Sequence, residues 1–259
     1  MKGELVRREL DGDVLVATID RPPRNAVDSE LHDALAALFR DLRREPGARS
    51  VLLTGAGTSF SAGGDFAWFP SLDSVEKLAD LHRHGKQLIW DLLDIDIPIV
   101  CAINGPAIGL GASIALLCDV IVMADTATIA DPHVRVGIVA GDGGAAIWPL
   151  VVGPARAKQY LLTGDAIGAA EAERIGLVNE VAPAAELTER AMVWARRLAA
   201  GAPLALRYTK QAVNAQVKRA LLESFDLSTA LELVTFASDD HREALAALRE
   251  KRSPRFEGR

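Results

Sequence analysis

Apolar and polar positions follow two different periods along the chain. Apolar-rich runs at 5–10 and 14–19 flank Asp11-Gly12-Asp13, a combination that predicts a β-hairpin. Short uncharged runs further along have the length and composition of buried strands. These strands are expected at 51–54, 99–103 and 120–124.

Between the strands, apolar residues recur at helical spacing. They repeat every three or four residues over 31–42, after Asp28 or Ser29 as the N-terminal cap, and Pro46-Gly47 marks the end of this segment. Two further helices are expected at 74–93 and near 110–117. Because strands alternate with helices, the pattern predicts an α/β fold with right-handed crossovers.

The pattern changes after about Pro154, where helical periodicity becomes nearly continuous. One strand is expected within this part, at 177–181. The helices are expected at 154–163, 169–176, 186–200, 203–216, 217–236 and 239–250. The sequence therefore predicts an α/β core over 1–197, followed by a helical region over 198–259.

Charge and hydropathy exclude several classes of partner. The 259 residues carry a net charge of −6, so the chain lacks the basic footprint of nucleic-acid binding. The stretch 98–118 is uncharged over a membrane-like length, but Asn104-Gly105-Pro106 and Gly109 interrupt it, which indicates strand, turn and helix in a protein interior. Residues 1–10 carry charges throughout and no signal-peptide core. We therefore expect a cytoplasmic protein without nucleic-acid or membrane partners.

The cysteines and histidines give no sign of a metal site. Cys101 and Cys118 lie in apolar runs and are expected to be buried, reduced thiols. No group of Cys and His at short spacing is present, so no metal ligands are expected. His82 and His84 are interpreted as surface residues of the helix 74–93. Four aromatic residues are interpreted as core, with the lining of an acyl pocket as the alternative: Trp68, Phe69, Trp90 and Trp148.

Two glycine-rich turns carry the clearest chemical signal. One is 60–66, FSAGGDF, after the strand at 51–54; the other is 104–113, NGPAIGLGAS, after the strand at 99–103. Each can present a backbone N–H to a ligand oxygen, and two such groups on one carbonyl would stabilise an enolate. A dinucleotide site is the competing interpretation, but the second turn lacks the third glycine of that fingerprint.

Four segments in this order resemble the enoyl-CoA hydratase/isomerase family. They are FSAGGDF, IPIVCAINGPAIGLGASIALLCDVIVMAD, HVRVGIVAGDGG and AKQYLLTGDAIGAAEAERIGLVNEV, and the end KRSPRFEGR is also similar. The resemblance covers nearly the whole chain. It implies a spiral of strand–strand–helix turns, a coenzyme A thioester as substrate, and no permanently bound cofactor. It also implies C-terminal helices that mediate trimerisation.

The resemblance also assigns residues that bind the substrate. The oxyanion-hole N–H groups fall on Gly64 and Leu110. Residues of the first turn that border coenzyme A are Ala62, Asp65 and Phe66, and Arg24 falls near a basic position that contacts the coenzyme. Arg24 is equally well interpreted as a solvated charge. The long apolar faces after about Leu198 favour a homotrimer or homohexamer, because a monomer would expose them.

The reaction is less well determined than the binding. The two glutamates that hydratases of this family use correspond to Ser113 and His133. Serine and histidine cannot repeat the division of labour of two carboxylates, so efficient hydration is not expected. His133 is expected to act as a general base near neutral pH and to be the main catalytic side chain, and Asp142 lies in a loop where some relatives have a working aspartate. The alternative is that His133 is a satisfied polar residue and Asp142 a turn residue.

Three alternatives remain open on the sequence. The segments around His133 and Asp142 also resemble β-diketone hydrolases that cleave C–C bonds, although these have another histidine where this chain has Gly111. Ser113, His133 and Asp142 follow the chain order of the Clp protease triad, which would make a serine hydrolase. The third alternative is a catalytically silent member that binds coenzyme A.

Overall fold

The computed structural model describes residues 4–45 and 47–259, and its main sheet contains the predicted strands. The hairpin is confirmed, because β1 (Val6–Asp11) pairs antiparallel with β2 (Val14–Ile19). The other four strands join in parallel, in the order β1-β2-β3-β4-β6-β9. Their bounds are β3 (Ser50–Gly55), β4 (Ile99–Ile103), β6 (Val120–Ala124) and β9 (Glu180–Ala182). The strand expected at 177–181 therefore starts three residues later.

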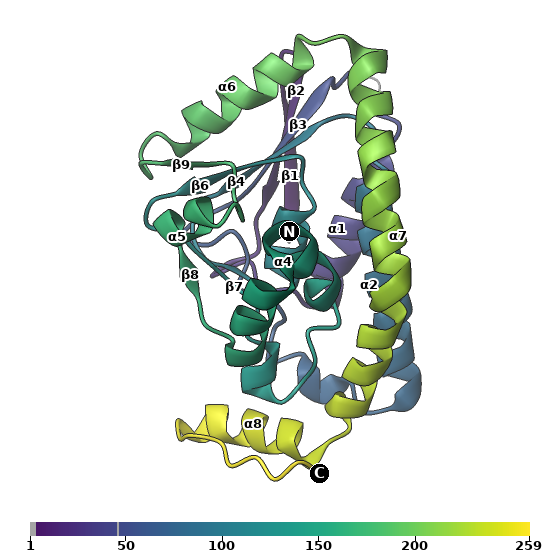
Figure 1. The fold of residues 1–259 in the computed structure, drawn as a ribbon, viewed down its shortest axis with the longest axis vertical. Coiled ribbons are helices and arrows are strands. Elements are labelled where there is room, and N and C mark those ends of the chain that lie inside the picture. Colours follow the sequence, from purple (N-terminus) through teal and green to yellow (C-terminus); the bar gives the residue numbers. More distant parts are fainter. Residues whose placement is uncertain (1–3, 46) are drawn as a thin grey trace.

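A second, smaller sheet was not predicted from the sequence. It contains β5 (Ala107–Ile108), β7 (Thr128–Ala130) and β8 (Ile167–Gly168), in that order. Segments of two or three residues are too short to show an alternating pattern, so periodicity does not reveal them. The two sheets lie side by side and together form the α/β layers of the fold (Figure 1).

The first two helices begin at capped positions, and the cap at Asp28 is one of the two that were predicted. The Asp28 carboxylate accepts from the backbone N–H of Leu31 at the start of α1 (Ser29–Leu42), and Ser74 accepts from Lys77 N–H at the start of α2 (Val75–Leu93). The helix α1 ends at Leu42, before Pro46, which lies outside the described residues. The short helix α3 (Leu110–Leu116) follows the second glycine-rich turn as expected.

The helix α4 begins ten residues earlier than expected. It spans Gly144–Thr163 and contains a break at Gly153, whose φ of 78° lies outside the helical region. The pattern at 154–163 therefore describes only its second part. Beyond it lie two helices at the expected places, α5 (Ala169–Arg174) and α6 (Leu187–Ala199).

A single long helix dominates the C-terminal region. The two helices expected at 203–216 and 217–236 are one continuous helix, α7 (Pro203–Phe236), because neither Gly nor Pro interrupts the sequence between them. Helix α7 runs along one side of the molecule, against α2 and α4, and α8 (Asp239–Glu250) turns across its end (Figure 1). A C-terminal element thus reaches the part of the α/β core where the glycine-rich turns lie.

Other expectations about the interior can also be compared with the structure. Cys101 and Cys118 are both buried and free, as expected. Trp148 is fully buried in the core, and Trp90 packs edge-to-face against Phe225 of α7, with 5.6 Å between the ring centres. No helix in the described part of the chain is long and apolar enough to cross a membrane.

The contact between Phe225 and Trp90 predicts how α7 is held. Phe225 is 1% exposed, and its replacement by alanine leaves a cavity between α7 and α2. We expect Phe225→Ala to lower the free energy of unfolding by about 3–5 kcal/mol in chemical denaturation. The control is Glu223→Ala, at an exposed position of the same helix, with an expected change within about 0.5 kcal/mol. A loss below about 1 kcal/mol for Phe225→Ala would contradict this packing.

Candidate active site

A pocket lies between the two glycine-rich turns on one side and α2 and α7 on the other. Both predicted oxyanion-hole residues, Gly64 and Leu110, line it, and so do His133 and Asp142. Most of the remaining lining is apolar or aromatic: Val27, Trp68, Phe69, Leu81, Ile138, Phe225 and Phe236. The structure therefore brings four of the predicted site residues to one cavity.

The backbone N–H groups of Gly64 and Leu110 have no hydrogen-bond acceptor among the described residues. Leu110 is the first residue of α3, where the N–H groups of a helix have no partner within the helix. The neighbours of both are occupied: Asp65 N–H donates to the Val27 carbonyl, and Gly109 N–H donates to Ala130. Backbone N–H groups without a partner are the donors from which oxyanion holes are built, so the oxyanion-hole role of Gly64 and Leu110 stays a prediction.

Gly109 needs to be glycine for two reasons. Its φ is 53°, a conformation that other residues seldom adopt. A Cβ at this position would also lie 3.3 Å from Cε1 of His133. The turn before α3 thus allows the His133 ring to lie close to the Leu110 N–H.

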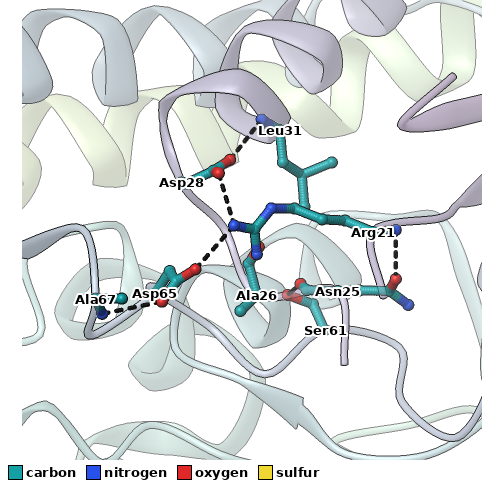
Figure 2. A network of polar contacts seen from close by, with 8 residues as sticks. All are labelled: Arg21, Asn25, Ala26, Asp28, Leu31, Ser61, Asp65 and Ala67. Carbon is teal, nitrogen blue, oxygen red and sulfur yellow. Dashed lines mark hydrogen bonds and ion pairs between the residues drawn. The ribbon is translucent and has the colours of Figure 1, made fainter. Parts of the chain in front are cut away.

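A polar network fixes the first turn (Figure 2). The Arg21 guanidinium donates to Asp28 at 2.6 Å and to Asp65 at 2.8 Å. Asn25 has a φ of 54° and is buried, and its amide donates to the carbonyls of Ala56, Ser59 and Phe60. These bonds connect the loop after β2 to the turn that carries Gly64.

Of the four residues predicted to border coenzyme A, Asp65 belongs to this network, and each of the other three is next in the chain to one of its members. Arg24 is exposed, and its carbonyl accepts from the N–H of Ala62 at 3.0 Å. Phe66 is 49% exposed and packs edge-to-face on Phe69. The Asp65 carboxylate binds Arg21, so within this structure it orders the turn. The coenzyme contacts of all four residues remain a prediction.

His133 is the first residue of the short 3-10 turn η2 (His133–Val136), and it lies between two carboxylates. Its Nδ1 contacts Asp131 Oδ1, and its Nε2 lies 3.4 Å from Asp142 Oδ2. Burial of the imidazole favours its neutral form, but the negative charges of Asp131 and Asp142 outweigh burial and raise the pKa of His133 well above its ordinary value. His133 is therefore an imidazolium near neutral pH.

Ser113 contacts Asp142 rather than His133. Its hydroxyl donates to Asp142 Oδ1 at 3.2 Å, and the serine is fully buried. Asp142 thus lies between the serine and the histidine. In a Ser–His–Asp triad the histidine lies between the serine and the aspartate and contacts the serine oxygen. Here the aspartate lies in the middle, so the contacts are not those of a triad.

Two residues of the site were missed in the sequence. Asp131 directly precedes the Pro132-His133 pair, and its side chain is completely buried, so the run DPH could have indicated it. Glu232 comes from α7 and lines the pocket at 8% exposure. Burial, followed by the charges of Asp142 and Asp131, raises the pKa of Glu232 to about 8 against the opposing charge of His133. No local sequence signal connects Glu232 to Asp142, which lies 90 positions earlier in the chain.

Two interpretations of aromatic and histidine residues change. Trp68 and Phe69 line the pocket rather than the core. His82 also lines it and is not the surface residue expected from the sequence, whereas His84 is exposed as expected. A helical pattern alone could not distinguish these two histidines, because the pocket is formed only when α7 packs against α2.

One group of residues among those described has the spacing of metal ligands. Single ligand atoms of Asp131, His133 and Asp142 all lie within 4.8 Å of one another. The imidazole lies between the two carboxylates, with one nitrogen facing each. Hydrogen bonding and charge therefore account for this arrangement without a cation.

Comparison with known proteins identifies the family of the chain. The family model described as enoyl-CoA hydratase/isomerase matches residues 9–259. A carnitinyl-CoA dehydratase of Escherichia coli is 34% identical over 254 residues, which cover 96% of this chain and 97% of the relative.

Two solved structures are similar over most of both chains. An enoyl-CoA hydratase/isomerase from Mycobacterium paratuberculosis has a TM-score of 0.90 and 37% identity, covering 94% of this chain and 98% of that one. A β-diketone hydrolase from the cyanobacterium Anabaena, bound to (S)-3-oxocyclohexyl acetic acid, has a TM-score of 0.85 and 32% identity, covering 91% and 95%. The fold, the pair of free N–H groups and these matches together show that the chain belongs to the enoyl-CoA hydratase/isomerase family.

Proposed function

We propose that this protein is an acyl-CoA enzyme that forms a thioester enolate and moves a proton on the acyl carbon chain, as an isomerase does. One observation carries the proposal. The Asp142–His133 pair lies in the same pocket as the two unbonded N–H groups of Gly64 and Leu110. Enzymes of this family act on coenzyme A thioesters without a permanent cofactor.

In this proposal the thioester oxygen accepts from Gly64 and Leu110. As a proton leaves the carbon beside the carbonyl, negative charge develops on that oxygen and strengthens both hydrogen bonds. Each preorganised donor of this kind lowers the activation barrier by about 3–4 kcal/mol, as judged from the loss of rate when one such donor is removed. Stabilisation of the enolate makes the C–H group a stronger acid, so that a carboxylate can deprotonate it.

Asp142 is the proposed base, and His133 is the proposed acid partner. Because His133 is already protonated near neutral pH, it stabilises the carboxylate of Asp142 and can return a proton to the substrate. Glu232, with a pKa of about 8, is mostly neutral at pH 7 and adds a second proton donor to the pocket. One base and one acid suffice for the transfer of a proton from one carbon to another.

Hydration is a weaker candidate for this site. The water must be held and split by two groups on the same side of the double bond. Ser113, at one of the two usual glutamate positions, is buried and donates its hydroxyl to Asp142. Ser113 therefore cannot share a water with a second carboxylate in the manner of the family's hydratases.

Hydrolysis of a carbon–carbon bond is the second candidate function, and the similarity to the β-diketone hydrolase of Anabaena favours it. In that reaction the Asp142–His133 pair would activate water to attack a carbonyl, and the released carbanion would leave as an enolate before protonation. The chain has Gly111 at the position of a further histidine in such enzymes. A Cβ at position 111 would lie 2.6 Å from Cβ of Ser61, so the present packing leaves no room for a side chain.

The remaining proposals concern binding and assembly. We assign coenzyme A to the outer side of the first turn, near Arg24, Ala62, Asp65 and Phe66. The proposed homotrimer or homohexamer is supported by a row of exposed apolar residues on the region 198–259. On α7 these residues are Leu204, Tyr208, Val213, Leu222, Leu227, Leu231 and Val234.

Leu110 offers a direct test of the oxyanion hole. Proline is well tolerated at the first position of a helix, and it removes the N–H of Leu110 without breaking a bond present in the structure. We expect Leu110→Pro to lower kcat by about 10²–10³-fold on the best thioester substrate, with an unchanged circular dichroism spectrum. Leu110→Ala keeps the N–H and should stay within about tenfold. Equal activities of the two variants would refute the role of this N–H.

A second test compares substrates and proton carriers. We expect wild type to turn over a 3-enoyl-CoA faster than it hydrates crotonyl-CoA, and Asp142→Asn to lose about 10²–10⁴-fold. Ser113→Ala serves as the control and should lose less than about tenfold. Cleavage of a cyclic 1,3-diketone in preference to either thioester would select the second function. Rapid hydration of crotonyl-CoA, or full activity of Asp142→Asn, would overturn the proposed one.

The raised pKa of His133 predicts a dependence on pH. A group with a raised pKa in the folded state stabilises the protein fully below its unfolded pKa of about 6.5, and this contribution is lost as pH rises through the folded pKa. The Tm difference between wild type and His133→Gln should therefore be largest near pH 6 and decrease at alkaline pH. A constant difference from pH 6 to pH 10 would contradict the assignment.

A further inference from the structure

A glycine in the middle of helix α2 lies in the wall of the pocket. Gly85 is an interior residue of α2, and unlike Gly109 it has no positive φ, so its backbone conformation does not require glycine. A Cβ built at this position would have no atom of a neighbouring element within 4 Å among the described residues, so packing does not require glycine either. Glycine is a much poorer helix former than alanine or leucine. Its presence at this point leaves free space beside α2.

That space belongs to the pocket. Gly85 and Leu81, one helical turn earlier, both line it, and side chains four residues apart lie on the same face of a helix. Phe225 of α7 lines the pocket on this side as well. Gly64 and Leu110, with their free N–H groups, lie on the side of the glycine-rich turns. An acyl chain whose thioester oxygen accepts from these two groups would therefore extend toward Gly85.

The wall beyond Gly85 separates the pocket from a second cavity. This second cavity also lies between α2 and α7, and it shares three lining residues with the pocket: His82, Lys86 and Thr229. The rest of its lining includes Trp90 and Leu233. The two cavities are therefore neighbours, and the Lys86 side chain forms part of the wall between them.

Lys86 is held in this wall by an exposed ion pair. Its ammonium group pairs with Asp226 of α7 and lies 5.5 Å from the ring centre of Trp90. The side chains of Lys86 and Asp226 are 39% and 65% exposed, and ion pairs with this degree of exposure contribute little to stability. Because the lysine stem is also flexible, the Lys86 side chain can move aside at a small cost in free energy.

We infer that the substrate has a linear acyl chain of medium or greater length, which passes over Gly85 and continues past Lys86 into the second cavity. The Lys86–Asp226 pair closes the passage beyond shorter chains and opens for longer ones. A passage between two packed helices suits a flexible chain better than a rigid ring. The inference rests on the proposed function, because it places the thioester in this pocket; it adds the class of acyl group and the residues that select it.

The test measures the binding of butyryl-, octanoyl- and dodecanoyl-CoA by calorimetry, together with the Tm of each protein. For wild type, we expect the affinity to rise from butyryl- to octanoyl-CoA, by about three- to fourfold for each methylene group that becomes buried. Gly85→Leu fills the space over which the chain passes. Octanoyl-CoA should bind to this variant about tenfold or more weakly than to wild type, the loss expected when at least two methylene groups are no longer buried. Its Tm should not fall, because leucine is the better helix former. Weaker binding without a lower Tm distinguishes a role in the pocket from a role in folding.

A second variant opens the wall instead of blocking the path. Lys86→Ala removes the side chain that a long chain must displace, so dodecanoyl-CoA should bind about three- to tenfold more tightly than to wild type, with octanoyl-CoA within about twofold. Lys86→Arg can keep the ion pair with Asp226 and should behave as wild type. The matched control is Lys77→Ala, whose lysine pairs with Asp73 at the other end of α2, outside the lining of both cavities. It should leave all three affinities unchanged.

The outcomes separate the inference from the proposed function. Equal binding of butyryl- and octanoyl-CoA by wild type would overturn the inference alone, and so would a Gly85→Leu variant that keeps the wild-type preference for the longer chain. Dodecanoyl-CoA that binds to Lys86→Ala no better than to wild type would refute the passage past Lys86. Failure of wild type to bind any of the three thioesters would overturn the proposed function, and the inference with it.

Discussion

The active site depends on a ladder of backbone hydrogen bonds that joins three loops. Ala62 N–H donates to Arg24, and Val27 N–H donates to Gly63, so the loop after β2 pairs with the first glycine-rich turn. That turn pairs in its other direction with the second one, through the N–H of Ile108 and the carbonyl of Ser61. Each turn is thereby fixed at both sides, and the N–H groups left over are those that face the pocket. The free donors are a consequence of pairing elsewhere, since a loose loop would satisfy them with its own carbonyls.

The charges in the pocket balance one another. Asp131 and Asp142 flank one imidazolium, and Glu232 lies near this group with its pKa raised to about 8. A third carboxylate would face two negative charges with a single cation in a buried setting, so its neutral form is favoured. With these charges, Asp142 is the proposed carboxylate that accepts a proton from the substrate, and His133 and Glu232 are the two proposed groups that can supply one. In the proposed function these groups take the place of the paired glutamates of the family's hydratases.

The sequence predicted those parts of the fold that have a local pattern. The cap at Asp28, the strands β4 and β6, and the two glycine-rich turns follow from spacing and residue type. The second sheet was not predicted, because its strands contain only two or three residues. Helix α7 was predicted as two helices, because a periodic pattern does not show whether two consecutive helical segments are continuous. For the site, the turns and the segment around His133 lie near one another through consecutive elements. Glu232 and His82 could not be found this way, since their place in the pocket depends on packing between helices distant in the chain.

This division between local and distant residues has a consequence for the chemistry. Glu232 and Thr229 lie on the same helix as Phe225, which packs on Trp90 of α2. One docked helix thus brings a neutral carboxyl toward His133 and places Thr229 in the lining of the same pocket. If α7 separated from α2, water would enter, Glu232 would ionise near its ordinary pKa, and the charge balance around His133 would change. The two free N–H groups belong to the α/β core, whereas Glu232 and part of the aromatic lining come from α7, so the charge balance of the pocket and the packing of the C-terminal helix are physically coupled.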